Sequence, residues 1–207
     1  MKKYMKLVFT GIQWCGKGTQ ARLLVEKYGF TLLEMWNEFR ALVASWTELG
    51  NQVKEVMNSW AQIDAEMWKE IMESVIKKQT AENIIFDAFI RNDWNKEIFD
   101  RILPDYQVIF FDLPIEKAKK RLLGRMFDSK TGETFLTWTT HNPKTGEELV
   151  KRDDDVHESA ILKRISEYEE KTLPIVAIQK TENKIIEINA DQAIDDVHSE
   201  IIKKLAL

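Results

Sequence analysis

Short apolar runs alternate along the chain with longer stretches whose apolar residues recur three or four positions apart. The short runs are typical of strands buried on both faces, and the longer stretches are typical of helices with one apolar face. The expected strands are Leu7–Thr10, Phe30–Leu33, Asn83–Asp87, Val108–Asp112 and Lys184–Asn189. The expected helices are Lys17–Tyr28, Trp36–Ser45, Gln52–Met57, Ala65–Lys78, Lys96–Leu103, Ile115–Arg125, Glu158–Ala177 and Gln192–Lys204.

This alternation predicts an α/β fold in which a five-stranded parallel sheet carries helices on both faces. Three helices between the second and third strands predict an inserted helical lobe at residues 36–65. Two turn-rich clusters, Asp-Ser-Lys-Thr-Gly and Asn-Pro-Lys-Thr-Gly, predict a β-rich lid at residues 127–150. We expect a single domain, 1–207, whose core comprises residues 1–35, 66–126 and 151–207.

The charge balance excludes a global attraction to nucleic acid. The 207 residues include 30 basic and 34 acidic side chains, which gives a net charge of -4. No stretch is apolar enough for a signal peptide or a membrane span, and the single cysteine, Cys15, cannot form an internal disulfide. We therefore expect a cytoplasmic protein that binds neither nucleic acid nor membranes.

A glycine-framed loop, Gly11–Gln20, lies between the first expected strand and the first expected helix. In such a loop the backbone N–H groups converge on an anion, and the helix N-terminus adds about half a positive charge. Lys17 supplies a cation for terminal phosphates, and Thr19 follows it after the intervening Gly18. The sequence therefore predicts a site for a nucleotide phosphate at this loop.

Further motifs follow in a fixed order along the chain. They are Gly-Lys-Gly-Thr-Gln at residues 16–20, Arg-Ala at 40–41, Ser-Trp-Thr-Glu-Leu-Gly at 45–50, Asp-Ala-Phe-Ile-Arg at 87–91, Arg-Leu-Leu-Gly-Arg at 121–125, Arg-Asp-Asp-Asp at 152–155 and Lys-Arg-Ile with Tyr168 at 163–168. Together they resemble the adenylate kinases, which are P-loop nucleoside monophosphate kinases. The resemblance covers nearly the whole chain and implies a monomer that transfers phosphate reversibly from ATP to AMP, giving two ADP, with Mg²⁺.

The resemblance also implies roles for individual residues. ATP would be bound by Gly16, Lys17, Gly18, Thr19, Arg121 and Arg125, and Mg²⁺ by Thr19 and Asp87, partly through water. AMP would be bound by Met35, Arg40, Ile63, Arg91, Asn95, Arg152 and Arg164. The catalytic set would be Lys17, Arg91, Arg125, Arg152 and Arg164. The spacing from Arg152 leaves open whether Arg164 or Lys163 fills the last position.

The chain departs from the family pattern mainly around the acceptor site. Trp14, Trp36, Trp46 and Trp60 stand where the family has glycine. A tryptophan there is strained wherever the backbone requires a positive φ, and Trp36 would lie beside the acceptor nucleoside. Ala88 replaces another glycine, Ile90 a proline and Asn37 an aspartate, while Met35 and Asn95 replace base-contacting residues.

These departures leave two alternative functions open. One is a kinase of a different nucleoside monophosphate, and the other is an ATP-binding homologue whose acceptor site is impaired or lost. One hypothesis for the tryptophans is a gene whose code reads UGA as glycine, translated with UGA as tryptophan. UGG or glycine codons at the four positions would contradict it.

The expected lid has no cysteines to bind zinc, so its own side chains must hold it. The candidates are Phe127, Phe135, Asp128, Thr131 and His141. His141, His157 and His198 lack the spacing of metal ligands, and we expect them in turns or on the surface.

Overall fold

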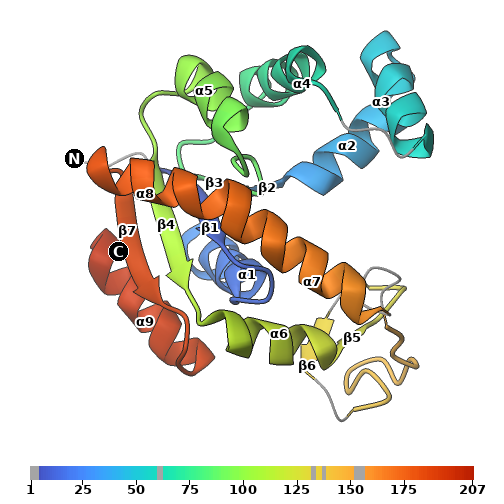
Figure 1. Cartoon of the computed structure of the whole chain (residues 1–207), viewed down its shortest axis with the longest axis vertical. Helices are drawn as coiled ribbons and strands as arrows, with labels where there is room; N and C mark the ends of the chain where they lie inside the picture. Colours follow the sequence, from blue (N-terminus) through green and yellow to red (C-terminus); the bar gives the residue numbers. More distant parts are fainter. Residues whose placement is uncertain (1–4, 60–62, 132–133, 137–138, 152–156) are drawn as a thin grey trace.

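The chain folds around a parallel five-stranded sheet with strand order β2-β3-β1-β4-β7, as the sequence predicts (Figure 1). The computed structural model describes residues 5–59, 63–131, 134–136, 139–151 and 157–207. The strands are β1 (Lys6–Gly11), β2 (Thr31–Glu34), β3 (Ile84–Asp87), β4 (Gln107–Asp112) and β7 (Ile185–Asn189). All pairs are parallel, so the carboxyl ends of these strands meet at one edge of the sheet.

Alternate side chains of the strands enter two separate apolar clusters. Leu7 and Phe9 of β1 belong to one cluster, whereas Val8 belongs to the other. The first cluster includes residues of α1 (Lys17–Tyr28), α6 (Ile115–Leu123), α7 (Glu158–Glu167) and α9 (Ile194–Leu205). The second includes residues of α2 (Met35–Ala44), α3 (Glu48–Ser59), α4 (Ala65–Lys77), α5 (Asp93–Ile102) and α8 (Leu173–Thr181). The helices therefore bury both faces of the sheet.

Helices α2 and α3 project from the carboxyl end of β2 at the upper right of Figure 1. Their close approach depends on Gly50, because a Cβ atom at this position would lie 2.1 Å from the carbonyl oxygen of Leu42. That distance is far below any van der Waals contact, so a side chain would push the helices apart. This pair of helices occupies most of the segment for which the sequence predicts a helical lobe.

Two of the expected helices are wrong in part. The expected helix to Arg125 ends at Leu123, and Arg125 begins the strand β5 (Arg125–Phe127), which pairs with β6 (Thr134–Leu136). The expected helix Glu158–Ala177 is interrupted by a π-helical turn at Tyr168–Thr172 between α7 and α8. Pro174 follows this turn and has no N–H to continue the regular α-helical hydrogen bonds.

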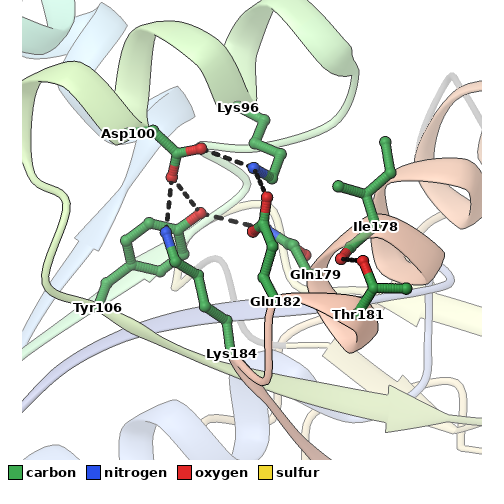
Figure 2. Close-up of polar contacts among 8 residues, drawn as sticks. All are labelled: Lys96, Asp100, Tyr106, Ile178, Gln179, Thr181, Glu182 and Lys184. Carbon is green, nitrogen blue, oxygen red and sulfur yellow. Dashed lines mark hydrogen bonds and ion pairs between the residues drawn. The ribbon is translucent and has the colours of Figure 1, made fainter.

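A charged network ties α5 to α8 at the amino end of the sheet (Figure 2). The Nζ atom of Lys96 lies 2.6 Å from a carboxylate oxygen of Asp100 and 2.7 Å from one of Glu182. Asp100 also accepts hydrogen bonds from the Tyr106 hydroxyl and the Lys184 ammonium. Burial would raise the pKa of Asp100, but the hydrogen bonds from Lys96, Lys184 and Tyr106 outweigh it and lower that pKa.

We predict that Lys96→Met lowers the free energy of unfolding by about 2 kcal/mol, because Lys96 is only 8% exposed and its ammonium pairs with both the half-buried Asp100 and Glu182. Urea denaturation measures the change. Lys77→Met is the matched control, since Lys77 forms the same kind of pair with Glu73 but its side chain is 71% exposed. The control should lose less than about 0.5 kcal/mol. Equal losses in the two variants would contradict a structural role for the Lys96 network.

Candidate active site

The glycine-framed loop joins the carboxyl end of β1 to the first turn of α1. Gly16 is the N-cap of α1 and adopts the left-handed conformation, with φ 98° and ψ 5°. At Gly11 a Cβ atom would lie 2.7 Å from the carbonyl oxygen of Phe111, so β1 and β4 require a glycine there. The half-buried Gly16, Gly18 and Thr19 surround the start of the helix. The loop therefore has the backbone geometry of an anion site.

The Lys17 side chain folds back onto this loop. Its Nζ atom lies 2.6 Å from the carbonyl oxygen of Gly11, 3.0 Å from that of Ile12 and 3.4 Å from the Sγ atom of Cys15. The ammonium is therefore held among the loop's own carbonyl groups, beside the positive end of α1.

Arg121 and Arg125, the two arginines predicted to bind ATP outside the loop, both reach Trp14 within it. A guanidinium nitrogen of Arg121 donates to the Trp14 carbonyl oxygen at 3.3 Å. The guanidinium carbon of Arg125 lies 5.6 Å from the centroid of the Trp14 ring, within cation–π distance, and Arg125 is buried. Two residues from α6 and β5 are thus brought to the phosphate loop.

Asp87, one of the predicted magnesium residues, stands at the carboxyl end of β3 in register with Phe9 of β1 and Glu34 of β2. Its Oδ1 atom is buried and has no hydrogen-bond partner among the described residues. Such an oxygen fits the second coordination sphere or a water ligand of Mg²⁺, which prefers carboxylate and water oxygens. Within the described part of the chain no group of three or more His, Cys, Asp or Glu residues forms a metal cluster.

Arg91 follows β3 in an irregular segment. Its side chain is accessible to solvent, but the protein around the guanidinium partly desolvates it and so lowers its pKa. The negative charges of Asp87 and Glu167 act in the opposite direction and raise that pKa. The Arg91 N–H donates to the Oδ1 atom of Asn95, and its carbonyl accepts a hydrogen bond from the Thr172 hydroxyl. Arg91 therefore stands near the end of β3, with its main chain held on both sides.

The other predicted acceptor residues differ widely in exposure. Met35 is 2% exposed and lies in the second core cluster, against which the half-buried Ile63 packs. Asn95 is also buried, and its Nδ2 atom has no hydrogen-bond partner in the part of the chain that the structure describes. Arg40 is exposed and donates to Asn37, which in turn donates to Glu34. Asn95 therefore places a buried amide donor next to the Arg91 main chain, to which its Oδ1 atom is hydrogen-bonded.

Of the two candidates for the last catalytic position, Arg164 is half-buried and Lys163 is exposed. Both lie in α7, whose first-cluster residues Ile161 and Ile165 face the sheet. This placement favours Arg164. Arg152, the remaining predicted arginine, lies outside the described residues.

The tryptophans at glycine-like positions fall into two backbone classes. Trp14 and Trp46 have φ values of 66° and 57°, and Ala88 has 65°, so these are positions where a side chain strains the backbone. Trp36 lies instead inside α2, with its ring against Phe39 and 52% of its surface exposed. Trp60 lies outside the described residues.

A buried carboxylate organises the segment predicted to be the lid. Asp128 accepts hydrogen bonds from the N–H groups of Lys130 and Thr131 and from the side chains of Asn142 and Thr145. These bonds, that from Asn142 foremost, lower the pKa of Asp128 to about 2. The sequence indicated Asp128 and Thr131 but missed Asn142 and Thr145, although both stand in a recognised turn cluster.

The ends of this segment are joined by backbone hydrogen bonds. Phe127 and Val150 exchange two of them, at 2.7 and 2.8 Å, and His141 pairs with Glu148 nearer the tip. His141 is exposed, as is His157, in accordance with the sequence.

His198 does not lie on the surface. It is 7% exposed on the apolar face of α9, and its Nδ1 atom lies 3.0 Å from Oε1 of Gln20. The signal was present in the sequence, because His198 follows Ile194 by four residues and precedes Ile201 by three.

A doubly covered parallel sheet with a glycine-framed phosphate loop after its first strand defines a P-loop kinase fold. A family model described as adenylate kinase matches residues 9–184. An adenylate kinase of Alkaliphilus oremlandii is 33% identical over 215 residues, covering 97% of this chain and 98% of that protein. An adenylate kinase of Fusobacterium nucleatum is 29% identical over 97% of this chain and 98% of its own length. The adenylate kinase 2 of Schistosoma mansoni is 31% identical over 96% of this chain and 88% of its own.

The chain belongs to the adenylate kinase family. None of the helices in the described part of the chain is both long enough and apolar enough to cross a membrane.

We predict that Asp128→Asn accelerates amide hydrogen exchange at Lys130 and Thr131, because an amide places a donor where Asn142 also donates. In the parent, protection should persist on acidification to about pH 4 and be lost only toward pH 2, since a carboxyl with a lowered folded pKa loses its contribution as pH falls through that value. Asp105→Asn, in an exposed turn, is the control and should leave these amides unchanged. Unchanged exchange in Asp128→Asn would refute this role of the carboxylate.

Proposed function

We propose that the protein transfers the γ-phosphoryl group of ATP reversibly to AMP, giving two ADP. The observation that carries this proposal is the phosphate loop at the end of β1, with Lys17 folded into it and Arg121 and Arg125 in contact with it. Three cations from separate elements are thereby concentrated around a set of backbone donors. Such an arrangement suits a polyphosphate better than a single phosphate.

The reaction needs no general base, because the attacking phosphate oxygen of a nucleoside monophosphate is already ionised. The protein must instead bring two phosphates together and neutralise the charge that develops between them. Lys17, Arg125 and Arg164 would take this role with Arg152, and Arg121 would stack on the donor base. Mg²⁺ bound with ATP, held by Thr19 and by Asp87 partly through water, would neutralise phosphate charge.

On the acceptor side, Arg40 and Arg91 would bind the phosphate of AMP. Arg91 supports this role best, since its accessible side chain lies near the end of β3, beside Asp87 and across the sheet edge from the loop. Met35 and Ile63 would contact the base. The Nδ2 atom of Asn95, which finds no partner within the described ranges, would donate to one of the base's acceptor atoms. We further propose a Mg²⁺-dependent monomer that acts in the cytoplasm.

A coupled assay of ADP formation, with and without AMP, tests the proposal. Turnover with ATP and AMP should exceed turnover with CMP, UMP or GMP. A preference for another monophosphate would instead identify a kinase of that nucleotide. ATP binding in calorimetry without AMP binding or turnover would identify an ATP-binding homologue with a lost acceptor site.

We predict that Lys17→Met reduces phosphoryl transfer to below about one tenth of the parent rate, because it removes a charge from the terminal phosphates. The melting temperature should change little, since Lys17 is half-buried and contacts only its own loop in the bonds described. Steady-state kinetics and thermal unfolding measure the two effects. A variant that retains more than one tenth of the rate would show that Lys17 does not bind the transferring phosphates.

We predict that Trp36→Gly lowers the KM for AMP severalfold, because it removes a half-exposed indole from the first turn of α2, next to Met35 and near Arg40. A glycine inside a helix costs about 1 kcal/mol, so the melting temperature should fall slightly. Trp46→Gly is the control: its indole is 81% exposed at a positive φ, so it should leave the AMP KM unchanged and raise the melting temperature. An unchanged AMP KM in Trp36→Gly would mean that the indole does not obstruct the acceptor.

A further inference from the structure

The main chain of Arg91 belongs to neither a strand nor a helix, and two side chains hold it in place. Its N–H donates to Oδ1 of Asn95 at 3.3 Å, one turn into α5. Its carbonyl oxygen accepts from the hydroxyl of Thr172 at 2.9 Å, 81 residues further along the chain. Outside regular secondary structure such contacts determine where a backbone group lies.

Thr172 is the last residue of the π-helical turn, directly before α8, and its backbone is helical with φ -90° and ψ -42°. Its hydroxyl does not bond to a backbone N–H of α8. It is directed instead across to the segment after β3, where it donates to the Arg91 carbonyl. A π-turn within a longer helix often occurs at a functional site.

The same helical rod bears on the Arg91 side chain as well. Glu167 is the last residue of α7, directly before the π-turn, and its charge acts on the Arg91 guanidinium together with that of Asp87. Arg164 lies one turn earlier on the same helix. Figure 1 shows α7 and α8 running on as one long rod in front of the sheet. The rod therefore contacts the acceptor arginine through its main chain and influences it through its charge.

We propose that Thr172 is a positioning residue for the acceptor phosphate: its hydroxyl fixes the Arg91 carbonyl and so sets where the Arg91 guanidinium stands. This inference rests on the proposed function, in which Arg91 binds the phosphate of AMP. Thr172 itself touches no substrate. Removal of the Thr172 hydroxyl should weaken binding of the acceptor and not of ATP. The phosphate loop and Lys17 follow β1 and begin α1, whereas Arg91 follows the neighbouring strand β3.

The test compares Thr172→Val with Thr172→Ser in the full-length protein, using AMP and ATP kinetics. Valine keeps the branched shape and loses the hydroxyl, whereas serine keeps the hydroxyl. In Thr172→Val the KM for AMP should rise about fivefold, the factor expected for one lost hydrogen bond, with the KM for ATP within about twofold of the parent. Thr172→Ser should restore the AMP KM to within about twofold of the parent value.

Thr181→Val is the matched control. Thr181 lies in the same helix, and its hydroxyl also donates to a carbonyl, but that carbonyl belongs to Ile178 in the same turn (Figure 2). This variant should leave both KM values unchanged. In an Arg91→Ala background Thr172→Val should add no further loss, because its effect passes through the arginine.

The outcomes separate the two proposals. An active parent whose Thr172→Val variant keeps the AMP KM, or loses affinity for both nucleotides alike, overturns the role of Thr172 and leaves the proposed function standing. An additional loss in the Arg91→Ala background also overturns it. A parent that forms no ADP from ATP and AMP overturns the proposed function, and the inference with it.

Discussion

Burying both faces of a parallel sheet is the constraint on which the rest of this structure depends. Helices cover each face, so side chains of the inner strands are apolar and polar groups are driven to the strand ends. At the carboxyl edge these ends carry Gly11, Glu34 and Asp87 on adjacent strands. The segments that leave this edge are the phosphate loop, after β1, and the segment that contains Arg91, after β3. The candidate site is therefore a consequence of how the sheet must be packed, and its cations arrive from elements that cover the sheet.

A network of charged side chains lies at the opposite edge, where the strands begin. The network of Lys96, Asp100, Tyr106, Glu182 and Lys184 joins α5 to the end of α8 and the start of β7 (Figure 2). In α5 the network residue Lys96 is next to Asn95, and α8 extends from Glu182 back to the turn that ends at Thr172. Lys96 directly follows Asn95 in α5, and Glu182 directly follows α8, whose first residue comes after Thr172, so the same charges join the two segments that hold the Arg91 main chain.

The sequence predicted the sheet and the phosphate loop because both have strong local signals: apolar runs of strand length, and glycines at set spacing. It misplaced Arg125 in a helix, because a basic residue after Leu123 and Gly124 continues a helical pattern as readily as it begins a strand. The π-turn has no periodic signal, and only Pro174 marks it. Asn142, Thr145 and Thr172 were missed because each acts through a partner distant in sequence. A glycine in related proteins does not by itself indicate a positive φ, as Trp36 shows, since its backbone is helical.

The contacts of Lys17 also bear on the free energy of nucleotide binding. Its ammonium already has acceptors in Gly11 and Ile12, so an arriving phosphate replaces partners and does not supply the first ones. Binding is then an exchange of hydrogen bonds, whose net free energy is smaller than the gross attraction between lysine and phosphate. Each phosphate contact that Lys17 gains is therefore offset by a carbonyl contact that it gives up, and the lysine contributes selectivity for anions more than affinity.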